Sequence, residues 1–139
     1  MSDFVRDIMT KDLITIDAEQ SAMEAAKSMS VHGISSIIVT SNNKPIGIVT
    51  ERDFLKKICL KDLTISDTKI GDIMSKIQTF ATPDTPLDVA VQRMLNKKIR
   101  RLPIVDTNGN LVGIITVTDL AKHLRKILLI DGALSISDR

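Results

Sequence analysis

The segment Gly47-Ile48-Val49-Thr50-Glu51-Arg52-Asp53 returns 66 positions later as Gly113-Ile114-Ile115-Thr116-Val117-Thr118-Asp119. A second segment returns as well, because Asp7-Ile8-Met9-Thr10-Lys11 is answered by Asp72-Ile73-Met74-Ser75-Lys76 at an offset of 65. Repetition at a fixed spacing is the sequence signature of duplicated structural units. The chain of 139 residues is therefore predicted to contain two homologous units of about 60 residues each.

Hydrophobic periodicity predicts the same order of elements, β-α-β-β-α, in both units. In the first unit the expected elements are a strand at 13–16, a helix around 22–29, strands at 36–40 and 46–50, and a helix from 53 to about 60. In the second they are a strand at 79–81, a helix around 87–94, strands at 102–105 and 111–116, and a helix at 119–130. Gly33 is expected to end the first long helix.

The two units are predicted to form one mixed α/β (α+β) domain. A unit of about 60 residues buries too little surface to be stable alone, and its two helices cover only one face of a three-stranded sheet. We therefore expect repeat 1 (1–60) and repeat 2 (70–130) to pack together with pseudo-two-fold symmetry. A polar linker (61–69) would join them, and 131–139 would form a tail. Clefts between the halves are favoured places for small ligands.

Composition limits the classes of function. Hydrophobic residues make up 43% of the chain, but there are only three aromatic residues and no Trp or Tyr, so a platform for stacking nucleic-acid bases is excluded. The formal net charge is only +2, which does not favour a nucleic-acid partner for the chain as a whole. One local excess of positive charge stands out, from Arg93 to Arg101.

Cysteine and histidine content argues against catalysis and metal binding. The single cysteine, Cys59, excludes a disulfide framework and a thiolate cluster, and it is expected to be buried in a helix. His32 and His123 lack a matching nucleophile or metal-ligand spacing, and no glycine-rich phosphate loop occurs. No apolar run approaches the length of about 18 residues that a membrane span needs. A non-enzymatic cytoplasmic protein is therefore predicted, with no metal and no membrane partner.

The repeated motif Gly-apolar-apolar-Thr-x-x-Asp has two compatible interpretations. Thr50 and Thr116 are good N-cap residues, and the acidic residue three positions later is typical of a capping box. The same junction could also bind a nucleotide, with helix amides and the Thr hydroxyl on phosphate and the carboxylate on ribose hydroxyls. In that interpretation Gly47 and Gly113 would let the ligand approach the strand closely.

These motifs resemble those of tandem cystathionine-β-synthase (CBS) domains, the Bateman module. The resemblance rests on the opening Asp7-Ile8-Met9-Thr10, the strand Ile99-Arg100-Arg101-Leu102-Pro103-Ile104-Val105-Asp106 and the two closing motifs, and it covers about residues 5–130. It implies two packed β-α-β-β-α units that sense an adenosyl ligand for an enzyme or channel. AMP, ADP or ATP is the expected ligand class, with NAD or S-adenosylmethionine as alternatives.

The resemblance also implies two clefts, each combining Thr and Asp of one copy with strands of the other. Site A would comprise Thr50, Asp53, Ile77, Gln78, Thr79, Ile99, Arg100, Arg101 and Pro103. Site B would comprise Leu13, Ile14, Ile34, Ser35, Ser36, Ile37, Thr116 and Asp119.

Arg100 and Arg101 distinguish the two predicted sites, because site B has Ser35 and Ser36 at the matching positions. Guanidinium groups suit bidentate phosphate contacts, so site A is expected to bind phosphorylated adenosyl ligands more tightly. Ile38 stands where the second copy has Pro103, which leaves an empty site B or a neutral nucleoside as the alternatives for that cleft.

Two kinds of macromolecular partner follow from the sequence. Because two repeats fill the chain, the regulated protein is expected to be a separate chain, and Ile127-Leu128-Leu129-Ile130 would either be buried in its own core or form a homodimer contact of the kind the family uses. The alternative function is nucleic-acid binding through the cluster from Arg93 to Arg101, with the same nucleotide as a modulator.

Overall fold

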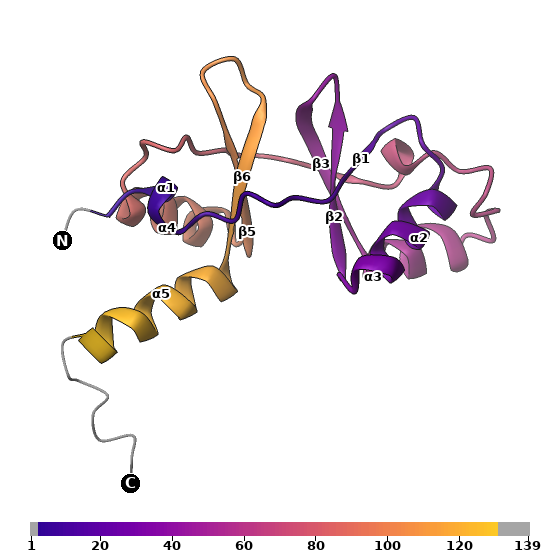
Figure 1. Cartoon of the computed structure of the whole chain (residues 1–139). Coiled ribbons are helices and arrows are strands. Elements are labelled where there is room, and N and C mark those ends of the chain that lie inside the picture. The colour runs from indigo at the N-terminus through magenta and orange to yellow at the C-terminus, as the bar shows by residue number, and fades with distance from the viewer. Residues whose placement is uncertain (1–2, 131–139) are drawn as a thin grey trace, which may run out of the picture. The chain divides into compact units, whose positions relative to one another are not determined.

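The computed structural model describes residues 3–130 and divides the chain into two compact units (Figure 1). One unit contains residues 13–78 and 109–111, and we call it the Asp53 unit. The other contains residues 3–12, 79–108 and 112–130, and we call it the Asp119 unit. The predicted tail, 131–139, lies outside the described residues.

The Asp53 unit is built on a four-stranded sheet in the order β1-β2-β3-β4. Strand β1 is parallel to β2, whereas β2–β3 and β3–β4 are antiparallel pairs. Its elements are β1 (Thr15–Asp17), α2 (Ala22–His32), β2 (Ser36–Ser41), β3 (Lys44–Thr50), α3 (Glu51–Phe54), the π-helical turn η1 (Leu55–Cys59), the 3-10 turn η2 (Ile70–Asp72) and β4 (Ser75–Lys76).

The Asp119 unit has the same plan with fewer regular strands. Strands β5 and β6 form a two-stranded sheet, and single bridges replace the outer strands. Ala81 bridges Ile104 in parallel, and Thr10 bridges Ile114 in antiparallel orientation. Its elements are α1 (Val5–Ile8), α4 (Leu87–Lys97), β5 (Arg101–Val105), β6 (Leu111–Thr116) and α5 (Val117–Ile130).

The opening segment of each repeat is paired with the last strand of the other repeat. Ser75 pairs with Ile48 of β3, and the corresponding Thr10 pairs with Ile114 of β6. The packing units therefore differ from the sequence repeats by an exchange of their opening segments. The mixed fold class is confirmed, while the repeat boundaries and the packing of the two repeats stay predictions.

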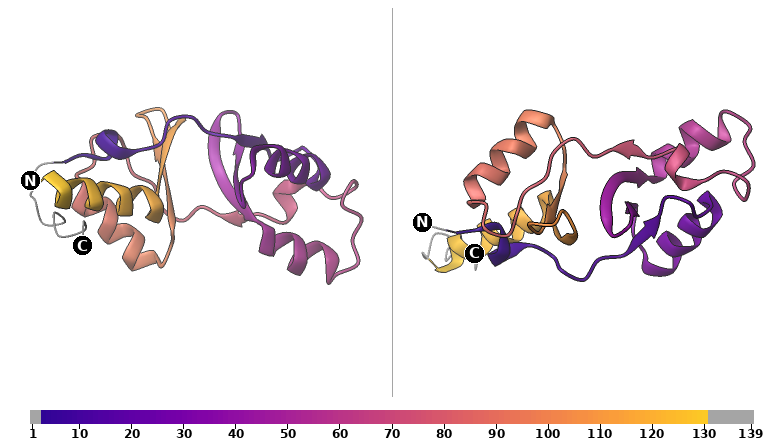
Figure 2. Two further views of the ribbon diagram at one scale, coloured as in Figure 1. Left: turned by 60° about the horizontal axis from the view of Figure 1, so that its bottom comes forward. Right: turned by 90° about the horizontal axis from the view of Figure 1, so that it is seen from above.

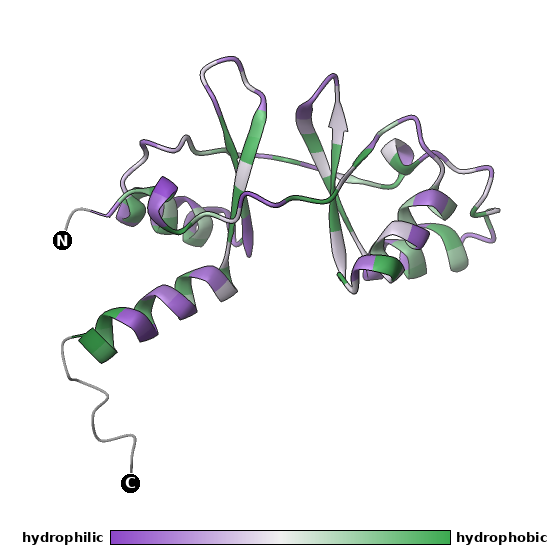
Figure 3. Ribbon diagram, viewed as in Figure 1, coloured by the Kyte–Doolittle hydropathy of each residue, from purple (hydrophilic) through white to green (hydrophobic). Residues whose placement is uncertain are grey.

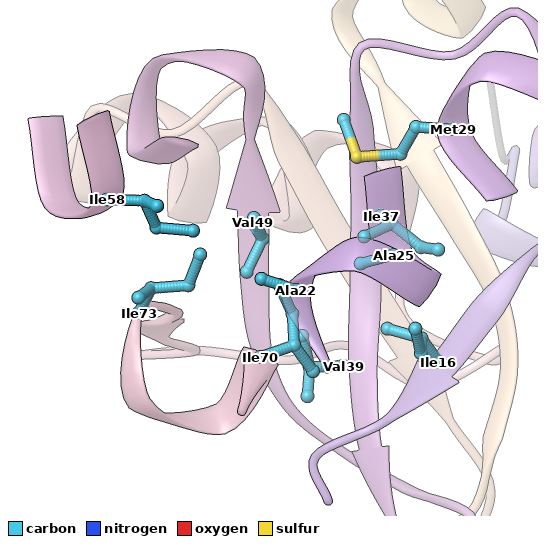
Figure 4. Packing of buried hydrophobic residues seen from close by; sticks show 10 residues of the cluster. All are labelled: Ile16, Ala22, Ala25, Met29, Ile37, Val39, Val49, Ile58, Ile70 and Ile73. Carbon is cyan, nitrogen blue, oxygen red and sulfur yellow. The ribbon is translucent and has the colours of Figure 1, made fainter. Parts of the chain in front are cut away.

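Both cores are aliphatic, as the composition requires. In each unit the helices lie on one side of the strands, which Figures 1 and 2 show from three directions. Figure 4 shows the core of the Asp53 unit: Ile16, Ala22, Ala25, Met29, Ile37, Val39, Val49, Ile58, Ile70 and Ile73. The core of the Asp119 unit consists of Val5, Ala81, Ala90, Met94, Leu102, Ile104 and Ile115.

Several local predictions are confirmed and others are corrected. Gly33 ends α2 in the left-handed conformation with φ 62°, as expected. The strand predicted at 79–81 is reduced to a single bridge between Ala81 and Ile104. The Ala81 amide donates to the Pro103 carbonyl and the Val105 amide donates to the Ala81 carbonyl, and two such bonds do not make a strand. The prediction that Cys59 is buried is wrong: the π-helical turn places Ile58 in the core and leaves Cys59 exposed.

The segment predicted as a linker is bound to the start of α2. The amides of Ala22 and Met23 donate to the carbonyls of Thr68 and Ile65 over 2.7 and 3.2 Å. The Ile65 side chain packs against the core of the Asp53 unit. Residues 61–69 therefore pack within the Asp53 unit, and their role as the linker between the two repeats stays a prediction.

Helix α5 carries apolar and polar residues in alternation, and its last turn is hydrophobic (Figure 3). None of its residues is buried, and Leu129 and Ile130 are 50% and 78% exposed. The alternative that 127–130 is buried in its own core is therefore wrong. Between residues 3 and 130, no helix has the length and apolar character needed to span a bilayer.

Candidate functional site

The first repeated motif forms the junction between β3 and α3. Thr50 is extended and precedes the helix, and its amide donates to Oδ2 of Asp53 over 2.8 Å. The Thr50 hydroxyl donates to the same oxygen over 3.3 Å. The Asp53 side chain is only 15% exposed, so these contacts hold a carboxylate at a defined place in a largely buried environment.

The second motif repeats this geometry at the junction of β6 and α5. The amide and hydroxyl of Thr116 donate to Oδ2 of Asp119 over 2.9 and 3.1 Å. The Asp119 amide donates back to the Thr116 hydroxyl oxygen over 3.2 Å, which completes a capping box. The helix-capping interpretation is confirmed at both junctions, and it leaves the Oδ1 atoms of the two carboxylates to other partners.

Helix amides are less available to a phosphate than the motif suggested. The amide of Glu51 donates to the Ser35 carbonyl, and the amide of Val117 donates to the Arg100 carbonyl, each over 3.1 Å. At the second junction the amide of the third helical residue, Asp119, is also taken, because it donates to the Thr116 hydroxyl oxygen. An anionic ligand at these junctions would therefore depend on side-chain cations more than on the helix terminus.

The two Oδ1 atoms have chemically different partners. Asp53 Oδ1 lies 3.2 Å from the ammonium of Lys57, which also donates to the Ile73 carbonyl over 2.9 Å. Asp119 Oδ1 instead accepts a hydrogen bond from the Thr10 hydroxyl over 3.2 Å. Neither Lys57 nor Thr10 was among the predicted site residues. The Asp53–Lys57 spacing of four was a detectable helical-pair signal, whereas no local pattern relates Thr10 to Asp119.

The motif glycines have a different role from the one expected. A Cβ on Gly47 would clash with the side chain of Met74, and a Cβ on Gly113 would lie 2.8 Å from the sulfur of Met9. Both methionines belong to the opening segments that pair with β3 and β6. The glycines therefore make room for these methionines, and the structure does not support the interpretation that they make room for a ligand.

The other predicted residues are distributed over the two units. In the Asp53 unit, the Ile77 amide donates to the Ile46 carbonyl over 3.2 Å, which places 77 next to β3. The remaining predicted residues of this unit are Leu13, Ile14, Ile34, Ser35, Ser36, Ile37 and Gln78. Those of the Asp119 unit are Thr79, Ile99, Arg100, Arg101 and Pro103. Ile37 and Pro103 are buried, whereas Ser35, Gln78 and Arg100 are exposed.

The basic cluster separates into two groups. Arg93 donates to the Phe80 carbonyl over 2.7 Å, and Lys97 and Lys98 lie exposed at the end of α4, as the helix-end interpretation predicts. Burial lowers the pKa of Arg101 from its ordinary value, and the like charge of Arg100 lowers it further. Among residues 3–130 neither of these two guanidinium groups forms an ion pair, so they carry uncompensated positive charge.

Comparison with known sequences accounts for the repeated motif. The family model of the CBS domain matches residues 5–60 and again residues 70–126. This chain belongs to the CBS domain family. The predicted resemblance is thereby confirmed for both repeats.

Relatives of this CBS pair extend over several kinds of protein. It is 40% identical over 117 residues to an uncharacterised protein of Methanopyrus kandleri, covering 84% of this chain and 60% of that protein. It spans between 23% and 74% of the length of the first four curated relatives it matches. Two of these are enzymes, a homoserine O-acetyltransferase and an inosine-5′-monophosphate dehydrogenase, so CBS pairs also occur within longer enzymes.

Solved structures match the CBS pair over nearly its whole length. A protein from Vibrio cholerae with the name AcuB has a TM-score of 0.81 at 26% identity, covering 96% of this chain and 98% of that one. The CBS domain pair of protein MJ0100, solved in complex with methylthioadenosine and S-adenosyl-L-methionine, has a TM-score of 0.77 at 29% identity, covering 91% and 98%.

Proposed function

We propose that this CBS pair is a non-enzymatic regulatory module that binds an adenosyl ligand at its two Thr-x-x-Asp junctions and signals to a separate partner protein. The observation that carries the proposal is the matched placement of Asp53 and Asp119. In each, the preceding Thr holds Oδ2 over 2.8–2.9 Å, while Oδ1 is bound only by side chains. Side-chain contacts can be exchanged for ligand hydroxyls without unfolding the helix cap.

The chemistry of the site fits a ribose. A carboxylate can accept hydrogen bonds from both hydroxyls of a ribose, as acidic residues do in dinucleotide-binding folds. The adenosyl ligands of the MJ0100 pair, which shares 29% identity with this chain, support the same ligand class here. The exact ligand is proposed to be AMP, ADP or ATP, because uncompensated Arg100 and Arg101 favour phosphate.

The assignment of residues to two composite clefts remains part of the proposal. Site A would join Asp53 to Arg100 and Arg101, and site B would join Asp119 to Ser35 and Ser36, as the family resemblance implies. The prediction that site A binds phosphorylated ligands more tightly therefore depends on an arrangement that binding data must test.

Calorimetric titration of the full chain with AMP, ATP, S-adenosylmethionine and NAD tests the function directly. We expect Asp53→Asn and Asp119→Asn each to remove one binding event, since an amide loses the charge-assisted acceptor. Asp67→Asn is a matched control, because Asp67 is exposed and forms no ion pair among residues 3–130. Unchanged titrations in the double variant would show that these junctions are not the ligand site.

We also propose that the module forms a homodimer and acts in the cytoplasm. The exposed apolar end of α5 supports an interface, since Leu124, Leu129 and Ile130 are at least half exposed. The single cysteine fits a reducing compartment. Sedimentation analysis of a chain ending at Lys126 checks the interface: we expect a monomer, and an unchanged dimer would place the interface elsewhere.

A further inference from the structure

Lys57 links the Asp53 carboxylate to a backbone carbonyl of the Asp53 unit. Its ammonium lies 3.2 Å from Asp53 Oδ1 and donates to the Ile73 carbonyl over 2.9 Å. The Lys57 side chain is 37% exposed, so solvent reaches its ammonium. The Asp53 carboxylate beside it is only 15% exposed. Two contacts on one ammonium hold the positive charge at the carboxylate, and leave one of its three donors for a further acceptor.

The π-helical turn η1 carries Lys57. This turn follows α3 directly, and a π turn changes the side-chain directions that an α-helix would give. Such turns are rare in proteins and occur frequently at functional sites. Here the turn carries Ile58 in the core and Lys57 beside both Asp53 and the chain just before β4.

The other repeat lacks this arrangement. His123 occupies the position that corresponds to Lys57, but its Nε2 lies 3.0 Å from Oδ2 of Asp3. Asp119 Oδ1 is bound instead by the neutral hydroxyl of Thr10. Within the described part of the chain Asp119 forms no ion pair. Two carboxylates with the same capping geometry therefore differ in charge compensation.

We infer that Lys57 is a specificity-determining residue, which makes the Asp53 junction accept anionic adenosyl nucleotides, whereas the Asp119 junction favours neutral or cationic adenosyl ligands. The inference rests on the proposed function and assigns a ligand class to each junction. It needs no contribution from Arg100 or Arg101, because the contacts that carry it lie within the Asp53 unit.

The physical basis is repulsion between the carboxylate and the phosphate of one bound nucleotide. A carboxylate that holds the ribose lies a few ångströms from the 5′ substituent, where an uncompensated pair of negative charges interacts strongly because the site is partly desolvated. Lys57 cancels the charge of Asp53, and its third N–H can donate a hydrogen bond to a phosphate oxygen. Thr10 donates a hydrogen bond to Asp119 but brings no positive charge.

The test compares AMP with adenosine, which differ by the phosphate. Calorimetry in an Asp119→Asn background isolates the Asp53 junction, and the ratio of adenosine to AMP dissociation constants is measured at low salt. We expect Lys57→Met to weaken AMP binding relative to adenosine binding and so to lower this ratio by about five- to tenfold, the scale of one partly screened charge pair. Lys57→Arg should preserve the ratio because it keeps the charge.

The controls separate charge from folding. Lys56→Met is the matched control, because Lys56 is exposed and forms no ion pair among residues 3–130. Lys57→Gln serves as a second variant if Lys57→Met fails to fold, and circular dichroism establishes folding for each. A shift that also appears in Lys56→Met would overturn the inference.

Failure of this inference is distinguishable from failure of the proposed function. If Asp53→Asn abolishes the titration but Lys57→Met and Lys57→Gln leave the AMP-to-adenosine ratio unchanged, the role of Lys57 is refuted and the ligand site stands. If Asp53→Asn itself has no effect on AMP or adenosine binding, both ideas fail together.

Discussion

Gly47→Ala tests what the glycine of the repeated motif does. Gly47 lies in β3 and pairs with Lys76 of β4, and a Cβ at this position would meet the Met74 side chain, with the Met74 Cβ only 2.9 Å away. Real Cβ atoms essentially never approach so closely. Met74 or β4 must therefore move, and we expect Gly47→Ala to lower the free energy of unfolding.

The magnitude follows from overpacking. Inserting a methyl group into a packed site costs about 1–3 kcal/mol. For a chain of this size that corresponds to a fall in Tm of about 3–10 °C. Met74→Ala alone should cost about 1–2 kcal/mol, because the methionine is only partly buried. Met74→Ala removes the two closest contacts, those with Sδ and Cγ, and leaves only the contact with Cβ. The double variant should therefore be more stable than the sum of the single effects predicts.

Urea unfolding of the four proteins in this double-mutant cycle provides the measurement. We expect a coupling energy of at least about 1 kcal/mol between the two sites. Additive effects would refute the packing explanation. If Gly47 served ligand approach instead, Gly47→Ala would weaken AMP binding in the Met74→Ala background as well, without a stability effect.

Three further predictions concern local backbone, buried charge and the basic cluster. Gly33→Ala should lower the free energy of unfolding by about 1 kcal/mol, because Gly33 has a φ of 62°. Lys98 ends α4 at the corresponding cap with a φ of 55°, so Lys98→Gly should raise the free energy of unfolding by a similar amount. Thermal unfolding measures both effects. The lowered pKa of Arg101 means that folding penalises its charged form at every pH below that pKa. Arg101→Met should therefore raise the free energy of unfolding at pH 7. Sulfate should stabilise the wild type more than this variant. If the chain binds RNA or DNA through the Arg93–Arg101 cluster, its affinity in filter binding should fall steeply with salt concentration. Lys97→Ala should then reduce the slope of log affinity against log salt concentration by about one unit. An affinity that does not change with salt would exclude that function.

Local features of this protein were readable from the sequence because each depends on residues a few positions apart. The contact between the Thr50 amide and the Asp53 carboxylate at the start of α3 joins residues three positions apart. The left-handed C-cap of α2 needs only Gly33 itself. The strand 79–81 and the burial of Cys59 were predicted wrongly for a different reason. Both depend on where neighbouring segments bind, and the π-helical turn changes the expected face of the helix.

The repeated motifs by themselves determined the family, the order of elements and the two capped carboxylates, since these follow from periodicity and short-range hydrogen bonding. Only the tertiary structure decided what lies beside each carboxylate. Thr10 reaches Asp119 across 109 positions of sequence, and Lys57 is tied to the carbonyl of Ile73. Such contacts depend on which opening segment pairs with β3 or β6, and the motifs alone leave this open because both segments contain Asp-Ile-Met and both strands contain a glycine that faces a methionine.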